Sequence, residues 1–435
     1  MFVFRFAVGV PCIALVVATS IVVASEPPRQ PSTRSTRTPA VVRRAAPPRA
    51  VADSHGEATA SDSPNTEAAT TSDAAQIETT ISDATASDGK ALRPAVKRQS
   101  FGGKVDLASF TTASAAAVAK TAPLNLPTYT FGGTEVWGDE LFYGKWRIQR
   151  NVLTNHCRLL DPDNLRHAWG TYEQCMARLK QLQTERHLSP VRGKVVIALH
   201  GLAAHRAMMT PLVEHLEKEG GFTVLNVTYP STRGTIAQHA QRLAGIVEHL
   251  DEATEIDFVA HSMGNLVVRY YLQVAVENSE DGRIDPRIKR FVMLGPPNHG
   301  AHCAVALGGN PIFDNVMGEA AQQLGRRWGE LAARLDTPPC DFAVIAGGLQ
   351  NRIGWNPLLE GDDDGLVKVD EARLAGAADF ALLDLHHVAM TFSATARDYT
   401  LRFLTEGRLR ADGERQPIPR EDAQQAKATS RSTMR

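Results

Sequence analysis

Ser262 is the residue whose surroundings most clearly suggest chemistry. The apolar run IDFVA, residues 256–260, has the composition of a buried strand, and AHSMGN leads from it into NLVVRYYLQVAV, which has helical periodicity. A serine on such a sharp strand-to-helix turn is held in a strained conformation that lifts its Oγ above the sheet, as in a nucleophile elbow. The residues two before and two after it must be small, and Ala260 and Gly264 meet this requirement. We therefore predict that Ser262 is a nucleophile rather than the serine of an ordinary tight turn.

A nucleophilic serine needs a general base, and two adjacent histidines are candidates. His386 and His387 directly follow the apolar run FALLDL. They therefore lie at the carboxyl end of a predicted strand, the edge at which open α/β sheets bind substrates. We prefer His387 because His386 continues the strand whereas His387 begins the loop, although strand alternation alone leaves the two nearly tied.

The base needs an acid to orient it, and the loop GDDDGLV after the strand FAVIAG offers three aspartates. Asp364, directly before Gly365, is nearest the following turn, so we prefer it to Asp362 and Asp363. The alternative is a solvated acidic loop or an incidental cation site.

A tetrahedral oxyanion needs at least two hydrogen-bond donors. The backbone N–H of Met263, next after the predicted nucleophile, is one of them. The segment KVVIALHGLAAH is an apolar strand that ends in His200-Gly201-Leu202, where the glycine lets the backbone turn sharply. We assign the second donor to the N–H of Leu202 and expect His200 to stabilise this loop rather than to take part in catalysis.

Apolar runs alternate with amphipathic stretches from Lys194 onward. KVVIAL, FTVLNV, IDFVA, KRFVML, FAVIAG and FALLDL are separated by segments of helical pattern such as IAQHAQRLAGIVEHL. Buried strands that cross over through helices predict an α/β fold with a mainly parallel sheet covered on both faces. The candidate residues would then meet at one edge of that sheet.

Taken together, AHSMGN, LHGL, GPPNHG and GDDDGLV resemble the small bacterial triacylglycerol lipases and related esterases of the α/β-hydrolase superfamily, over about residues 194–407. The resemblance implies an α/β-hydrolase fold with a triad of Ser262, Asp364 and His387. Its implied oxyanion donors are Leu202 and Met263. It also suggests that the helical insert at 301–341 is a lid; a fixed helical cap is the alternative.

The sequence outside the candidate site predicts a leader, a linker, an N-terminal extension and a tail around the catalytic domain. The uncharged apolar run at 6–24 is typical of an export signal but is also close to the ~18 residues that span a bilayer, so 1–24 is either a signal peptide or a membrane anchor. We expect residues 25–123 to form a disordered, low-complexity linker, because their composition cannot bury enough apolar area to fold. Three further parts are an N-terminal extension at 124–190 that packs on the catalytic domain and includes the helical pattern YEQCMARLKQLQTE, the catalytic domain at 191–410, and a flexible tail at 411–435.

Net charge and cysteine content limit the partners, disulfides and cofactors that we expect. A net charge of -1 and a pI near 6.9 provide no broad basic surface, so we expect no nucleic acid partner. Four cysteines beyond the leader predict either two disulfides or buried free thiols, and one disulfide could staple the base of the insert; they are Cys157, Cys175, Cys303 and Cys340. None has CxxC spacing, which argues against a metal or redox centre, and acyl transfer by a serine triad requires neither a metal nor an organic cofactor.

These features predict an exported serine hydrolase that cleaves carboxylic esters, with lipids as the expected substrates. It would be periplasmic, secreted or attached to the membrane by its N-terminal segment. An amidase, thioesterase or acyltransferase acting on envelope lipids or peptides is the alternative, because one triad serves all of these reactions. A non-catalytic binding module of the same fold is a further alternative, but it would be expected to lack part of the triad.

Overall fold

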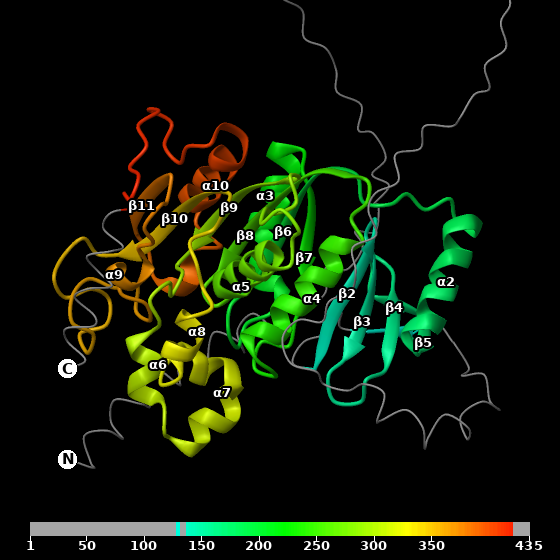
Figure 1. Ribbon diagram of the computed structural model, residues 1–435, viewed down its shortest axis with the longest axis horizontal. Coiled ribbons are helices and arrows are strands. Elements are labelled where there is room, and N and C mark those ends of the chain that lie inside the picture. The colour runs from blue at the N-terminus through cyan, green and yellow to red at the C-terminus, as the bar shows by residue number, and fades with distance from the viewer. Residues whose placement is uncertain (1–127, 131–135, 421–435) are drawn as a thin grey trace, which may run out of the picture. The chain divides into compact units, whose positions relative to one another are not determined.

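The computed structural model describes residues 128–130 and 136–420, which form two sheets with their helices (Figure 1). The leader predicted at 1–24 and the linker predicted at 25–123 lie outside the described residues. Among the residues that are described, no helix is both long and apolar enough to cross a bilayer.

The larger sheet contains all six of the strands predicted from Lys194 onward. They are β6 (Gly193–Leu199), β7 (Thr223–Val227), β8 (Ala253–His261), β9 (Ile288–Leu294), β10 (Asp341–Gly348) and β11 (Asp379–Asp384). Their order is β11-β10-β9-β8-β6-β7, and every neighbouring pair is parallel. The predicted fold class is confirmed in its architecture: the chain has an α/β fold with a parallel sheet.

Helices cover both faces of this sheet, which explains why its strands are apolar throughout. On β6, Val195, Ile197 and Leu199 face the cluster that contains α4 (Ile236–Glu248) and α5 (Gly264–Glu277). The alternate residues of β6 face the opposite cluster, to which two other helices contribute, α3 (Thr210–Gly220) and α10 (Ala394–Glu406). Figure 1 shows the two pairs on opposite sides of the sheet.

The insert predicted at 301–341 forms three short helices: α6 (His302–Leu307), α7 (Pro311–Leu324) and α8 (Trp328–Ala332). The buried guanidinium of Arg269, on α5, fastens its base by donating to the carbonyl oxygens of Asn298, Leu335 and Asp336. Glu371, on α9 (Val369–Ala372), accepts the backbone N–H of His302 at 2.8 Å. The insert is thus a helical cap tied at both of its ends to the sheet domain.

The disulfide considered for the base of this insert is not formed. Cys303 and Cys340 are not joined by a disulfide and pack in different apolar clusters. Cys157 and Cys175 share one cluster and are free thiols. Burial raises the pKa of the Cys157 thiol to about 11 and that of Cys175 to about 12, so both stay protonated. The prediction of buried free thiols is therefore the one that fits the structure.

The smaller sheet is antiparallel and lies in the N-terminal extension. Its strands are β1 (Thr128–Tyr129), β2 (Trp137–Tyr143), β3 (Trp146–Asn151), β4 (Cys157–Leu160) and β5 (Leu165–Gly170), in the order β1-β5-β4-β3-β2. The predicted helix is α2 (Tyr172–Glu185), whose Leu179 and Leu182 pack against Ile148 and Leu159 on one face of this sheet.

Asp139 on β2 connects the extension to the larger sheet. Its N–H donates to the carbonyl oxygen of Thr228, just beyond β7, at 2.8 Å, and its Oδ2 accepts the Thr228 N–H at 2.6 Å. The neighbouring Glu140 pairs with Arg242 of α4 at 3.1 Å. Both contacts join the two sheets along β2.

Residues 411–420 belong to the predicted flexible tail and make several contacts with the sheet domain. The Ile418 N–H donates to Ala377 O at 2.9 Å, and its side chain packs against the main core. Asp379 Oδ1 accepts the Gln416 N–H at 2.9 Å. A buried carboxylate and one apolar side chain therefore hold this polar segment in place, and 421–435 lies outside the described residues.

The buried carboxyl of Asp257 on β8 should make the stability of the fold depend on pH. Burial raises its pKa from 3.8 to about 7, against the lowering effect of the Arg290 N–H that it accepts. Because the folded state binds this proton more tightly, the contribution of Asp257 is fully present below 3.8 and is lost as pH rises to about 7. Asp257→Asn, which keeps the uncharged shape, should be the more stable protein above this window. The difference in free energy of unfolding between the variant and the wild type should narrow by at most about 1.4 kcal/mol per pH unit as pH falls. Urea unfolding across this pH range measures the difference, and a difference that does not change with pH would contradict the raised pKa of Asp257.

Candidate active site

Ser262 has the strained backbone that its sequence context predicts. Its φ is 55°, a left-handed value that is uncommon for a residue other than glycine. Its N–H donates to Leu294 O at 2.9 Å, and the Asn265 side chain donates to Ser262 O at 2.8 Å. The end of β9 and the first turn of α5 thus hold the serine at the end of β8.

The turn needs glycine on both sides of the contact between the serine and the β6 loop. A Cβ at Gly264 would lie 2.6 Å from His200 O, and a Cβ at Gly201 would lie 2.8 Å from the Ser262 Cβ. Both distances are shorter than real Cβ atoms tolerate. The elbow and the His200-Gly201-Leu202 loop can therefore touch only because these two positions lack a side chain.

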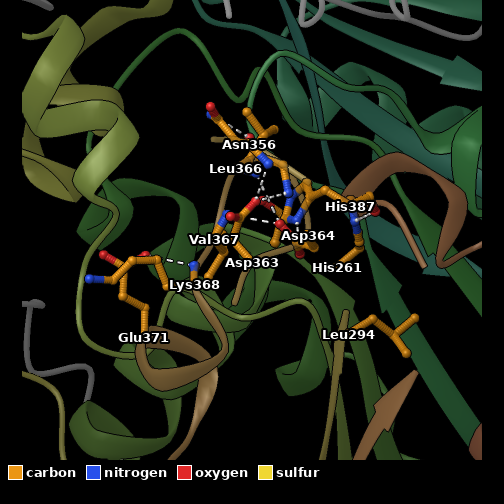
Figure 2. A network of polar contacts seen from close by, with 12 residues as sticks. His261, Leu294, Asn356, Asp363, Asp364, Leu366, Val367, Lys368, Glu371 and His387 are labelled. Carbon is orange, nitrogen blue, oxygen red and sulfur yellow. Dashed lines mark hydrogen bonds and ion pairs between the residues drawn. The ribbon is translucent and has the colours of Figure 1, made fainter. Parts of the chain in front are cut away.

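Asp364 and His387 are hydrogen-bonded to each other. His387 Nδ1–H donates to Asp364 Oδ2 at 2.7 Å, and both side chains are buried (Figure 2). Asp364 Oδ1 accepts the N–H groups of Leu366 and Val367 at 3.1 and 2.8 Å, which fix the carboxylate. A second bond, from His387 N–H to Asp364 O at 2.8 Å, joins the two loops. Because Nδ1 carries the proton, Nε2 is the nitrogen that can accept one.

The other two aspartates have different partners. Asp362 caps the end of β10 by accepting the N–H groups of Leu349 and Gln350. Asp363 accepts the N–H groups of Gly365 and Asn356, and burial raises its pKa to about 6. Of the three, Asp364 is the one whose carboxylate bonds a histidine.

His386 occupies a different environment from His387. Its ring meets Trp355 edge-on, with centroids 5.8 Å apart, and burial lowers its pKa. His387 instead begins a 3₁₀ turn and lines the same pocket as Ser262. Among the described residues, no hydrogen bond joins Ser262 Oγ to His387; such bonds often tighten only when a substrate binds.

The Leu202 loop is held by His200 and Tyr229. The Tyr229 hydroxyl donates to His200 O at 2.5 Å, and the two rings stack with centroids 4.3 Å apart. His200 Nδ1–H donates to Gly201 O at 2.9 Å, and burial lowers the His200 pKa to about 4, which keeps the ring neutral. The His200 and Gly201 carbonyl oxygens thus both accept hydrogen bonds. Within the described part of the chain, neither the Leu202 N–H nor the Met263 N–H has an acceptor.

These residues line a narrow apolar pocket of about 110 Å³. Its polar side chains are Ser262, His261 and His387, and its other walls include Leu202, Leu307, Phe313 and Met317. The last three belong to the cap, whose own apolar cluster also contacts Leu202. The site therefore has its polar groups at one end and the cap helices as walls.

Three supporting residues were not predicted from the sequence. Tyr229 and His261 bond backbone atoms that are distant in the sequence; His261 Nε2–H donates to His387 O at 2.9 Å. Asn265 bonds the nearby Ser262 O and also Leu294 O, 29 residues away. Burial lowers the pKa of His261 to about 3, so it remains neutral beside His387. The asparagine of AHSMGN was the one visible signal, because its position in the motif puts its side chain next to the turn.

A family model described as a domain of unknown function, DUF7379, matches residues 163–317, which run from β5 through the elbow into the cap. A comparison with curated proteins found no match. No group of three or more metal-ligating side chains occurs within residues 128–130 and 136–420.

Several solved structures are similar to about half of the chain. Lipase BlEst2 from Bacillus licheniformis, in its propeptide form, is 14% identical, with a TM-score of 0.38, over 53% of this chain and 53% of that one. Phospholipase PlaB from Legionella pneumophila is 17% identical, with a TM-score of 0.36, over 49% of this chain and 60% of that one. The lin2722 product from Listeria innocua is 16% identical, with a TM-score of 0.35, over 49% of this chain and 94% of that one. At these identities the chemistry has to be read from this chain's own side chains.

The geometry predicts that Ser262 is the residue most reactive toward a fluorophosphonate. Mass spectrometry of the intact protein should show a single addition that disappears in Ser262→Ala. His387→Ala should slow labelling by about a hundredfold or more, because a positioned general base contributes that much. His386→Ala is the matched control and should label at nearly the wild-type rate. Equal slowing by the two histidine variants would contradict the choice of His387.

Proposed function

We propose that this chain is a serine hydrolase that cleaves carboxylic esters with apolar acyl groups. The observation that carries this proposal is the buried 2.7 Å bond between Asp364 and His387, at a pocket that also contains Ser262 on its strained turn. A nucleophile, a base and an orienting acid are the parts that acyl transfer requires.

In the proposed reaction, His387 Nε2 removes the Ser262 proton as Oγ attacks the ester carbonyl carbon. The carbonyl oxygen becomes negative and accepts hydrogen bonds from the N–H groups of Leu202 and Met263. The imidazolium then protonates the departing alcohol, which leaves an acyl group on Ser262. Water, activated by His387, attacks this acyl-enzyme and releases the carboxylic acid. Asp364 keeps the proton on Nδ1 and stabilises the imidazolium throughout.

The pocket favours an acyl chain as the group beside the scissile bond. Its side walls carry no charged residue, so a charged substrate group would lose its hydration there without gaining a partner. Its volume, about 110 Å³, is well below the ~300–1,000 Å³ of pockets for drug-sized ligands. A single slender alkyl chain suits these dimensions better than a bulky ring.

The N-terminal sequence extends the proposal to location. An export signal or anchor at 1–24 would bring the enzyme to the membrane or beyond it, where lipid esters are available. Lipid substrates and membrane attachment are therefore part of the proposed function.

The first test is hydrolysis of nitrophenyl esters of increasing acyl length by the full chain. Turnover should fall by at least about a thousandfold in Ser262→Ala, because the triad acts as a unit. Ser279→Ala, which changes a surface serine, is the matched control and should retain wild-type turnover. If no ester is cleaved, or if Ser262→Ala is as active as the wild type, the ester assignment is wrong. Amides, thioesters, acyl acceptors and binding without turnover would then be the functions to test.

Met317 on α7 should set the acyl length that the pocket accepts. Met317→Trp fills the pocket and should shift the optimum to shorter chains, whereas Met317→Ala should shift it to longer ones. For the longest chains, kcat/KM of Met317→Trp should fall by about tenfold or more, since one methylene in a tight pocket changes it by 10–200-fold. Val316→Ala, at an exposed position on the same helix, is the control. Shifts in the same direction for both Met317 variants would indicate that the acyl chain lies elsewhere.

A further inference from the structure

The smaller sheet has a second hollow, which the proposed reaction does not use. It has a volume of about 310 Å³ and is lined by Trp137, Thr154, His156, Arg158, Arg166 and Trp169. In register, Arg158 is opposite Trp169, and the hairpin at 151–156 leads to His156, two residues before Arg158. Side chains two apart on a strand point to the same face, so the hollow lies on the face opposite α2.

A buried chain of hydrogen bonds positions the central guanidinium of this hollow. Gln149 Nε2 donates to Asp139 Oδ1 at 2.7 Å. Arg158 then donates from Nε and Nη2 to Gln149 Oε1, at 3.0 and 2.7 Å. Its guanidinium lies over the Trp137 ring, 3.9 Å from the centroid. Arg158 is thus fixed in place by a neutral amide, and its Nη1 has no acceptor among the described residues.

The charge around Arg158 is unbalanced. The charged groups that act on it are Arg147 and Arg166, which lower its pKa together with the larger effect of burial, and Asp139, which raises it. Asp139 is already engaged by Gln149 and by the Thr228 N–H, and it lies 3.5 Å from the Arg147 Nε. Asp161 also acts on Arg147, so Asp139 is the one carboxylate that acts on Arg158 itself, beside two neighbouring guanidinium groups. A buried, preorganised and incompletely compensated cation of this kind favours an anion from outside.

The other walls of the hollow suit a sugar ring. Trp169 is 41% exposed. The Arg166 Cζ lies over its ring, 5.7 Å from the centroid, and the centroid of the His156 ring is 5.3 Å from that of Trp169. An indole face packs against the C–H face of a pyranose, while Thr154 and His156 can hydrogen-bond its hydroxyl groups. A single-stranded nucleic acid needs a basic groove that follows its backbone. Here the two cationic side chains of the hollow are confined to one point, and the whole chain has a net charge of -1.

We propose that this hollow binds a sugar that carries a carboxylate, such as one unit of an acidic polysaccharide. The carboxylate pairs with Arg158 and Arg166, and the sugar ring packs on Trp169. The extension would then hold the enzyme on a polymer outside the cell, independently of what the catalytic pocket cleaves.

The test is calorimetric titration of the full chain with a trimer of galacturonic acid and with its methyl ester, which has the same rings but no charge. We expect the acid to bind and the ester not to. Arg166→Gln and Trp169→Ala should each weaken binding of the acid by about tenfold or more, because each removes a charge-assisted bond or a stacking surface. Arg178→Gln, the same change on the opposite face at α2, should leave binding unchanged. Binding should also weaken with added salt.

Three outcomes would overturn the proposal: no binding of the acid, equal binding of acid and ester, or binding that neither hollow variant alters. Oligothymidylate and phosphatidylglycerol vesicles serve as competing probes. If either binds through Arg166 while the sugar acid does not, the hollow is a nucleic acid or membrane site instead. Ester turnover, measured in parallel, should be unchanged in all three variants, so failure of this proposal and failure of the ester assignment are separate results.

Discussion

The candidate active site depends on one close approach between backbones, where the loop after β6 meets the turn after β8. Two glycines make it possible, because a Cβ at either Gly201 or Gly264 would collide with the opposite segment. The same approach holds Ser262 at a φ of 55°, a conformation that costs about 1–3 kcal/mol. Leu294 and Asn265 offset this strain through hydrogen bonds to the Ser262 backbone. The proposed nucleophile and both proposed oxyanion donors are therefore placed by packing that precedes any substrate.

Burial makes the single charge at this site effective. Asp364 is nearly inaccessible to solvent, and the histidines packed around the elbow stay neutral because burial lowers the pKa of His200 to about 4 and that of His261 to about 3. No other cation at the pocket competes for the carboxylate. In a medium of low dielectric constant, a charge acts strongly on a nearby group that becomes charged. In the proposed reaction the imidazolium of His387 is that group, so the negative charge of Asp364 would act mainly when the proton is transferred.

The sequence was sufficient for the larger sheet and less so for the details of the loops. Its six apolar runs predicted six strands because each strand is buried on both faces. The preference for Asp364 over Asp362 and Asp363 rested only on its place before Gly365, because a pattern of residue types does not show which carboxylate meets a histidine; in the structure Asp364 bonds His387. The smaller sheet was missed for a different reason: its second face buries polar residues such as Gln149 and Arg147, so its strands lack a clear apolar alternation. Tyr229 was missed because its partner, His200, is 29 residues away.

Asp139 gives the extension a structural connection to the catalytic loop. Its carboxylate accepts a hydrogen bond from Gln149, which in turn accepts from Arg158. The same carboxylate accepts the Thr228 N–H, and the Asp139 N–H donates to Thr228 O. Thr228 directly precedes Tyr229, whose hydroxyl donates to the His200 carbonyl beside Leu202, the proposed oxyanion donor. Contiguity of this kind is not evidence of energetic coupling between the two hollows. It does mean that the extension supports the end of β7, and that a sequence able to fold the larger sheet alone would lack one support of the loop that contains Leu202.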